Sequence, residues 1–232
     1  MMKNATAPSL FLLSLLPVQA EIEHEIPWGI ETVVGIRSAY LYRGFELAET
    51  SQDLQIEAEI ALSNETSFNI GTWHLSESSG DFSETGLFLD LKHDLNARTQ
   101  IGTSLTYRNI RNSVLESGLD IGVFASYQIN DLWDVKAGAS YDIGNDLFYA
   151  YTELRWSKPL SEDAFLSFDH GVSFTSDNFE RDGFNDLYGR LSLTYAISDS
   201  VAVTPFIGWS ILLDESSAHD PVYGGIWFAF VF

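Results

Sequence analysis

Charged side chains recur at alternate positions along much of the chain, so that acids and bases share one face of successive segments. Opposite charges on neighbouring strands can pair and stabilise a polar surface. If that face lines a water-filled space, rings of charge instead select the solutes that enter it. The acids are Glu57, Glu59, Glu84, Asp90, Asp120, Asp134, Asp142, Glu153 and Asp169. The bases are Arg37, Arg43, Lys92, Arg108, Lys136, Arg155 and Arg190. The near balance of the two signs leaves both interpretations open.

A second pattern that could do chemistry is the pair His74 and Ser76. Residues two apart on a strand share a face, where an imidazole can activate a hydroxyl as a nucleophile. This arrangement resembles that of barrel enzymes that hydrolyse membrane lipids, which carry a His-x-Ser pair near the outer end of a strand. Glu77 and Ser78 follow here, in place of the Asn and Gly that such enzymes carry after the serine. A lipid hydrolase is therefore an alternative, and we predict no enzymatic activity.

Both patterns lie on segments in which polar and apolar residues alternate, which is typical of β-strands. Breaks rich in Asn, Asp, Ser and Gly separate these segments and predict turns. From Ile30 onward, twelve segments result. They cover residues 30–43, 52–62, 67–76, 83–93, 98–109, 117–129, 132–142, 147–157, 163–175, 185–197, 200–212 and 222–232. An even number of strands returns both chain ends to one side, as bacterial single-chain barrels require.

The face opposite the charged one is apolar. Examples are Leu54, Ile56, Ala58 and Ile60, then Leu87, Leu89 and Leu91, and later Leu119, Ile121, Val123, Leu191 and Leu193. One face for lipid and one for water predicts an all-β fold, a transmembrane antiparallel up-and-down β-barrel of 12 strands. The alternative is a secreted β-sandwich or soluble barrel that packs its apolar face inward. Leu and Ile alone do not fill the interior of a closed twelve-stranded barrel, which favours the membrane barrel.

Aromatic residues near the strand ends support the membrane barrel, because such barrels carry aromatic girdles at both interfaces. The girdle on the side of the chain ends would contain Trp133, Trp156, Tyr127, Tyr195 and Phe232. The opposite girdle would contain Tyr40, Tyr107, Tyr141 and Trp209. Two belts of this kind match the two surfaces of a bilayer.

The beginning of the chain has the features of an export signal. Residues 1–20 hold an early positive charge, a short apolar run and small residues before the end, which predicts a signal peptide cleaved after Ala20. Residues 21–29 then form a periplasmic N-terminal segment, and residues 30–232 form a single outer-membrane domain. We therefore expect a multi-pass protein of the Gram-negative outer membrane, in contact with its lipids and lipopolysaccharide.

Composition excludes several partners and cofactors. The formal net charge of −21 at pH 7 disfavours nucleic acid, whose phosphates attract clustered Lys and Arg. The absence of cysteine from the sequence rules out disulfides and thiolate metal sites. The acidic outer loops lack the spacing of known calcium loops, so we predict no metal and no cofactor.

The last strand alternates up to the terminal Phe232, with Ile226, Phe228 and Phe230 on the same face. A final amphipathic strand that ends in phenylalanine resembles the signal by which the barrel assembly machinery recognises outer-membrane proteins. We therefore expect that machinery as a partner, through Phe232.

An N-terminal stretch resembles a known family. The matching residues are Ser38, Ala39, Tyr40, Leu41, Tyr42, Arg43 and Gly44, followed by Gln55, Gly71, Thr72, Trp73 and Glu84. This pattern is similar to the N-terminal signature of the TorF family of porin-like exported proteobacterial proteins, over residues 30–92. The resemblance implies an outer-membrane barrel and no established substrate.

Loop lengths and inward aromatics predict the width of the pore. Twelve tilted strands enclose a backbone cylinder of roughly 24 Å, which side chains narrow. The outer loops cover residues 44–51, 77–82, 110–116, 143–146, 176–184 and 213–221. Because they are short, we expect none to enter the lumen as a plug, and any obstruction to come from inward side chains or residues 21–29. The inward aromatics are Phe88, Phe124, Tyr149, Tyr151, Phe165, Tyr188, Phe206 and Trp227.

The predicted function is a narrow porin for small polar solutes. Its pore-lining residues are the charged residues named first, except Asp120 and Asp142. A structural surface barrel without a transport role is the further alternative.

Overall fold

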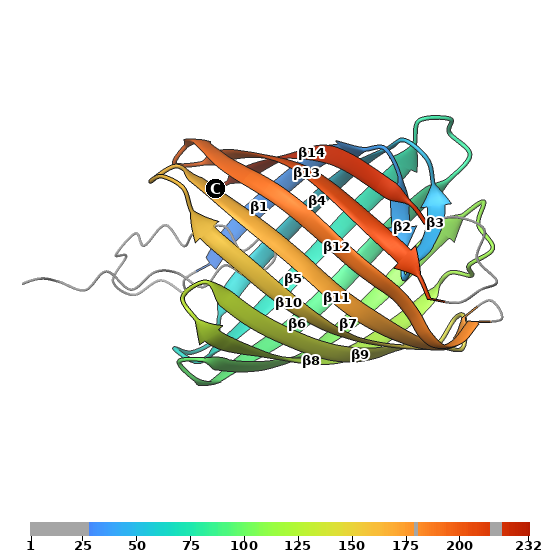
Figure 1. Ribbon diagram of the computed structural model, residues 1–232, viewed down its shortest axis with the longest axis horizontal. Coiled ribbons are helices and arrows are strands. Elements are labelled where there is room, and N and C mark those ends of the chain that lie inside the picture. The colour runs from blue at the N-terminus through green and yellow to red at the C-terminus, as the bar shows by residue number, and fades with distance from the viewer. Residues whose placement is uncertain (1–27, 179–180, 214–219) are drawn as a thin grey trace, which may run out of the picture.

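The computed structural model describes residues 28–178, 181–213 and 220–232, which form a closed β-barrel around a small internal hairpin (Figure 1). The twelve wall strands are β1 (Trp28–Arg37), β4 (Ser51–Ala61), β5 (Thr66–Glu77), β6 (Ser83–Asn96), β7 (Thr99–Arg111), β8 (Gly118–Asn130), β9 (Trp133–Asp142), β10 (Leu147–Pro159), β11 (Ala164–Asn178), β12 (Arg181–Ser198), β13 (Val201–Leu212) and β14 (Val222–Val231). The hairpin consists of β2 (Tyr40–Tyr42) and β3 (Phe45–Ala48). The predicted signal peptide, residues 1–20, lies outside the described residues, as does most of the segment 21–29.

The wall strands pair antiparallel in sequence order, and the barrel closes where β1 pairs with β14. This confirms the predicted all-β barrel of 12 strands. Ile30 and Phe232 exchange backbone hydrogen bonds, so β1 begins and β14 ends at the same end of the barrel. We call this the terminal end, and we call the opposite end the hairpin end. In the described part of the chain, no helix has the length and apolarity needed to span a bilayer.

The predicted outer loop 176–184 was wrong in its extent, because β11 continues to Asn178 and β12 already begins at Arg181. The first predicted strand, residues 30–43, differs most from the structure. β1 ends at Arg37, and the chain then turns into β2. Arg43 and Gly44 have positive φ angles of 51° and 80°, and they join β2 to β3 as a two-residue turn. Such left-handed pairs form the tight turns whose twist matches antiparallel strands. The alternation that suggested a longer strand therefore belongs to the hairpin.

The hairpin lies inside the barrel near one mouth (Figure 1). Tyr40 bonds to Glu84 on β6, whereas Arg43 bonds to Asn185 on β12, on the opposite side of the wall. The expectation that no outer loop enters the lumen is therefore wrong. Because β1 stops early, the connection between β1 and β4 covers residues 38–50, which is long enough to fold inward.

Large apolar side chains cover the outside of the wall. Leu87 and Val123 are 51 % and 57 % exposed, and many outward residues on the other wall strands are similarly open. This arrangement contradicts the alternative in which the apolar face packs inward. Tyr107 and Tyr141 lie on the outer surface as expected, but Tyr40, predicted for the same girdle, lies in the hairpin instead.

Inside the wall, large aromatic rings lie over glycines of the neighbouring strand. A Cβ at Gly35 would lie 2.1 Å from the ring of Trp227, and one at Gly86 would lie 2.1 Å from the ring of Trp73. Each ring thus occupies the space that a larger residue beside it would need. The rings narrow the lumen from the wall, as the inward aromatic residues of the sequence indicated.

Gly225→Ala is expected to lower the free energy of unfolding by about 1–3 kcal/mol, the usual cost of overpacking. Its Cβ would lie 2.4 Å from the backbone oxygen of Ile36, across the β1–β14 pair that closes the barrel. Gly29→Ala is the matched control, because nothing lies within 4 Å of its Cβ position. Urea unfolding in detergent micelles, followed by tryptophan fluorescence, measures both. Equal losses for the two variants would contradict the steric explanation.

Candidate functional site

The strand register places the predicted wall charges on the lumen side, together with Phe206 and Trp227. Arg43 is the exception, because it occupies the tip of the hairpin rather than the wall. The lumen with its hairpin is therefore the candidate site. Its charges fall into two groups, those that the protein pairs internally and those that it leaves without an ion-pair partner.

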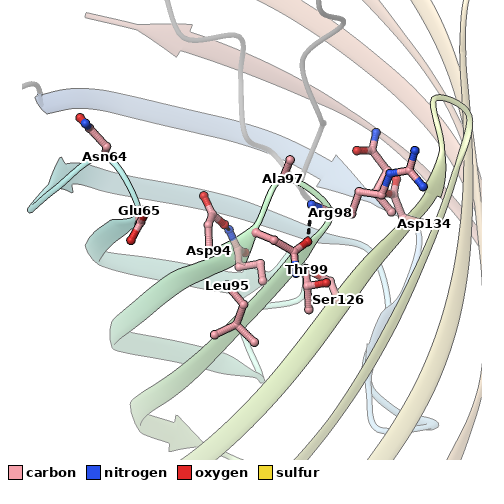
Figure 2. Close-up of a pocket in the computed structure, with 12 residues that line it drawn as sticks. Asn64, Glu65, Asp94, Leu95, Ala97, Arg98, Thr99, Ser126 and Asp134 are labelled. Carbon is pink, nitrogen blue, oxygen red and sulfur yellow. Dashed lines mark hydrogen bonds between the residues drawn. The ribbon is translucent and has the colours of Figure 1, made fainter.

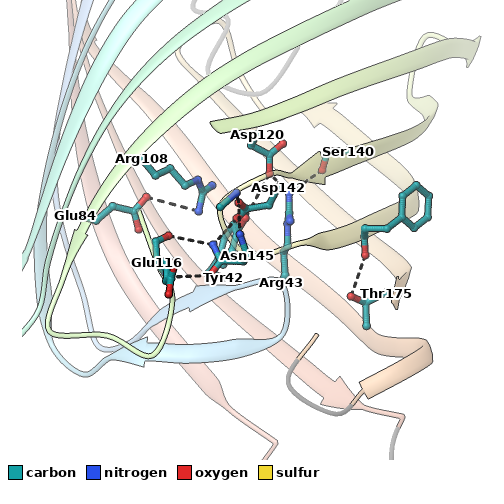
Figure 3. A network of polar contacts seen from close by, with 12 residues as sticks. Tyr42, Arg43, Glu84, Arg108, Glu116, Asp120, Ser140, Asp142, Asn145 and Thr175 are labelled. Atoms are coloured by element: carbon teal, nitrogen blue, oxygen red, sulfur yellow. Dashed lines mark hydrogen bonds and ion pairs between the residues drawn. The ribbon is translucent and has the colours of Figure 1, made fainter. Parts of the chain in front are cut away.

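Arg43 anchors the tip of the hairpin to three wall strands, and Figure 3 shows its contacts to two of them, β8 and β9. Its guanidinium forms an ion pair with Asp120 on β8 and donates a hydrogen bond of 2.7 Å to Ser140 Oγ on β9. Its backbone carbonyl accepts a hydrogen bond of 3.0 Å from Asn185 Nδ2 on β12. One residue thus holds the hairpin across the width of the lumen.

Tyr42 packs beside this anchor. The guanidinium carbon of Arg108 lies 3.8 Å from the Tyr42 ring centroid, and that of Arg43 lies 4.8 Å from it. The Tyr42 hydroxyl donates a hydrogen bond of 3.5 Å to Asp120. Burial raises the pKa of the Tyr42 phenol, so the hydroxyl stays protonated as a donor. The two arginines and the ring form a compact cationic and aromatic layer.

Glu84 holds the other side of the hairpin and is fully buried. It accepts hydrogen bonds from the Tyr40 hydroxyl at 3.0 Å and from Trp73 Nε1 at 3.2 Å. Arg108 Nη1 lies 3.6 Å from Glu84 Oε1, the oxygen that also accepts from Trp73 (Figure 3). Glu84 was predicted to line the pore, but its contacts make it a structural anchor beneath the hairpin.

A chain of ion pairs follows β10, β11 and β12 along the wall. Arg155 contacts Glu153 at 3.1 Å and Asp169 at 2.7 Å, and Arg190 contacts Asp169 at 3.0 Å. The guanidinium of Arg190 also lies 5.2 Å from the Trp227 ring centroid. These four charges are largely satisfied by one another. Here the structure favours the interpretation of mutual pairing.

A further group of inward charges lies toward the terminal end. Among the residues that the structure describes, no ion pair is formed by Glu57, Glu59, Asp90, Lys92, Asp134 or Lys136. Lys136 Nζ instead lies 4.6 Å from the Phe124 ring centroid. Charges of both signs thus face the lumen without a protein counter-ion, which is the condition for acting on a passing solute.

Two inward acids near these groups were missed by the sequence analysis. Glu31 shares the inner face of β1 with Gly35, and Asp53 forms an ion pair with Arg37. Asp53 also accepts a hydrogen bond of 3.3 Å from Trp227 Nε1. Their alternation with residues already assigned inward is the signal that could have found both. The lumen is consequently more acidic than predicted.

Asp142 is inward but serves the chain locally. It accepts hydrogen bonds from the backbone of Gly144 and from the side chain of Asn145, at 3.0 Å and 2.9 Å. Asn145 in turn donates to the backbone carbonyl of Glu116 (Figure 3). Asp142 therefore stabilises the connection between β9 and β10 and the loop beside it.

A cavity of about 450 Å³ lies at the terminal end, between two turns and the wall (Figure 2). Its lining residues are Asn64, Glu65, Asp94, Leu95, Asn96, Ala97, Arg98, Thr99, Gln100, Ser126, Gln128 and Asp134. Almost all of these side chains are polar, and Gln100 Nε2 donates to Asp94 at 2.8 Å. This end therefore offers a hydrophilic recess at the mouth of the lumen.

The pair His74 and Ser76 lies on the outer face of β5. His74 Nδ1 shares a hydrogen bond of 2.9 Å with the Thr85 hydroxyl on β6. Within the described residues, no hydrogen bond joins His74 to Ser76. The imidazole therefore faces a structural partner rather than the hydroxyl that a hydrolase would activate.

Comparison with known proteins identifies the fold. No family model matches the sequence, and no curated protein matches it. The solved KdgM porin superposes with a TM-score of 0.59 at 8 % identity, over 88 % of this chain and 99 % of its own. The NanC porin gives 0.57 at 8 % identity, over 87 % and 98 %. The COG4313 outer-membrane channel of Pseudomonas putida F1 gives 0.59 at 13 % identity, over 94 % and 100 %. The chain thus shares its barrel fold with solved outer-membrane porins and channels.

Proposed function

We propose that this protein is a narrow outer-membrane porin for small polar solutes. The observation that carries the proposal is the division of its surfaces. An apolar exterior surrounds a lumen with charges of both signs that form no ion pair with any described residue. An apolar exterior suits lipid, and a charged interior suits water. The barrel fold shared with solved porins supports this proposal.

The same proposal gives the chain its place in the cell. A signal peptide over residues 1–20 would export it, and Phe232 would mark it for the barrel assembly machinery. The terminal end then faces the periplasm, and the hairpin end faces lipopolysaccharide. The resemblance over residues 30–92 supports membership of the TorF family.

The hairpin is the element that would limit solute size. It crosses the lumen between β6 and β12, with the aromatic rings of Tyr40 and Tyr42 among wall charges. A solute must therefore pass beside the hairpin or wait for it to move. We infer small conductance and passage of small solutes only.

Purified protein in planar bilayers should show discrete current steps. Lys136→Glu is expected to raise the ratio of cation to anion permeability, because it replaces a lumen cation by an anion. Lys158→Glu makes the same charge change on an exposed residue at the end of β10 and should leave the ratio unchanged. A silent bilayer at saturating protein would sink the porin proposal and favour a structural surface barrel.

A further inference from the structure

Three carboxylates share one stretch of the inner wall near the terminal end. Glu31 on β1 is the direct register partner of Glu57 on β4, and Glu59 follows on the same face. Asn69 on β5 is the register partner of Glu59. Direct partners across an antiparallel pair have Cβ atoms about 4.5–5.5 Å apart. We call Glu31, Glu57, Glu59 and Asn69 the acceptor cluster.

The deepest members of the acceptor cluster lack hydrogen-bond partners. Glu31 is 8 % exposed and Asn69 is 4 % exposed. Glu31 Oε1 and Asn69 Oδ1 are both buried and accept no hydrogen bond from the part of the chain that the structure describes. A buried acceptor without a hydrogen bond lowers the stability of a protein by about 1–3 kcal/mol, and by more if the acceptor is charged. The acceptor cluster could therefore accept further hydrogen bonds from a bound molecule.

The neighbouring charged and polar side chains supply few hydrogen-bond donors to the acceptor cluster. Glu57 accepts a hydrogen bond of 2.9 Å from Gln55 Nε2, the one donor to its carboxylate among the described residues. Lys92 on β6 is the cation whose charge acts on Glu57, while Glu59 and Asp90 act with the opposite sign. Lys92 forms no ion pair with any member of the cluster in the described structure. Lys92 thus offsets part of the repulsion among the carboxylates, but in the described structure it donates no hydrogen bond to them.

A ligand that fits must bring positive charge and several N–H donors. Among the described residues, no group of three or more His, Cys, Asp or Glu side chains is arranged to hold a metal ion. An ammonium group differs from a metal, because its three N–H donors can reach separate acceptors without a closed coordination shell. Exposure also falls from Glu59, which is open, through Glu57 to the buried Glu31, so a ligand can approach along this line.

We propose that the acceptor cluster binds the ammonium group of small organic amines that enter the lumen. The proposal rests on the porin function proposed above and names a solute class for that lumen. Glu31 and Asn69 supply the buried acceptors, and Glu57 and Glu59 supply the charge that draws the amine inward. The protein would consequently favour amines over neutral solutes of the same size.

The test measures binding of putrescine to the refolded full chain in detergent micelles by equilibrium dialysis at pH 7. The double variant Glu31→Gln/Glu57→Gln is expected to bind roughly tenfold to a hundredfold more weakly, as for lost charge-assisted hydrogen bonds. Asp199→Asn removes an exposed acid from the turn between β12 and β13, outside the lumen, and should stay within about twofold. If the double variant does not fold, Glu59→Gln at the open rim replaces it.

Equal binding by wild type and the double variant would overturn the proposal, as would equally tight binding of neutral 1,4-butanediol. Bilayer recordings separate this result from the porin proposal. Current steps without putrescine binding would contradict the proposed amine site and support the porin proposal. Putrescine binding by a protein that gives no current in bilayers would support the amine site and contradict the porin proposal.

Discussion

Arg43→Ala is expected to raise the mean single-channel conductance several-fold. The variant loses the ion pair with Asp120 and the hydrogen bond to Ser140, which hold the tip of the hairpin. Hydrogen bonds to charged groups contribute about 1.5–3 kcal/mol, so the ratio of docked to undocked hairpin should fall roughly tenfold to a hundredfold. An undocked hairpin no longer crosses the lumen between β6 and β12. Planar-bilayer recordings measure the effect directly.

Arg111→Ala is the matched control for this experiment. Arg111 is an exposed arginine at the end of β7, near the same mouth of the barrel. Its removal changes the net charge equally but touches no hairpin anchor, so conductance should stay at the wild-type level. The hairpin would lose its role as the constriction if Arg43→Ala conducted like wild type. Asp120→Ala should reproduce the Arg43→Ala effect, and the double variant should add little, because both residues belong to one ion pair.

Glu84→Ala is expected to lower the free energy of unfolding by about 3–5 kcal/mol, the cost of removing one partner from a buried ion pair. Glu84 is fully buried and serves Tyr40, Trp73 and Arg108 at once. Without it, the Arg108 guanidinium remains in the wall without its carboxylate. Urea unfolding of the micelle-bound barrel, with tryptophan fluorescence as the signal, gives the difference.

Two further variants show whether the charge or the shape of Glu84 matters. Glu84→Gln keeps an acceptor for Tyr40 but loses the charge, so we expect a smaller loss of about 1–3 kcal/mol. Glu46→Ala removes an exposed acid from the same hairpin and should change stability by less than about 0.5 kcal/mol. A loss for Glu84→Ala no larger than that for Glu46→Ala would show that the buried contacts do not stabilise the barrel.

Most of the barrel could be predicted because the alternation of polar and apolar residues within a wall strand indicates which of its faces points outward and which points into the lumen. Each wall strand turns one face to the outside of the barrel and the other to the lumen, so Leu87 and Leu89 alternate with Phe88 and Asp90 whatever the neighbouring strands are. Turns made of Asn, Asp, Ser and Gly then mark where each strand ends. The strand count and the inward positions followed from these local signals.

The hairpin could not be predicted in the same way. Tyr40 and Tyr42 occupy alternate positions, as residues of a wall strand would. No residue type at Arg43 and Gly44 separates this turn from the strand that the alternation predicts. Its strands occupy the lumen, where the partners come from Glu84, far along the chain on β6, and from β8 and β12. Local periodicity contains no information about such distant contacts.

The pairing of lumen charges shows the same division. The sequence by itself determined that Glu153, Arg155 and Glu57 point inward, because inward placement depends only on strand parity. Only the tertiary structure decided that Arg155 is neutralised by Glu153 and Asp169 whereas Glu57 has no ion-pair partner among the described residues. Which charges pair depends on strand register and on side-chain reach across the wall, and both are set when the barrel closes. The sequence therefore determined a charged lumen, and the closed barrel decided which of its charges lack an ion-pair partner among the described residues.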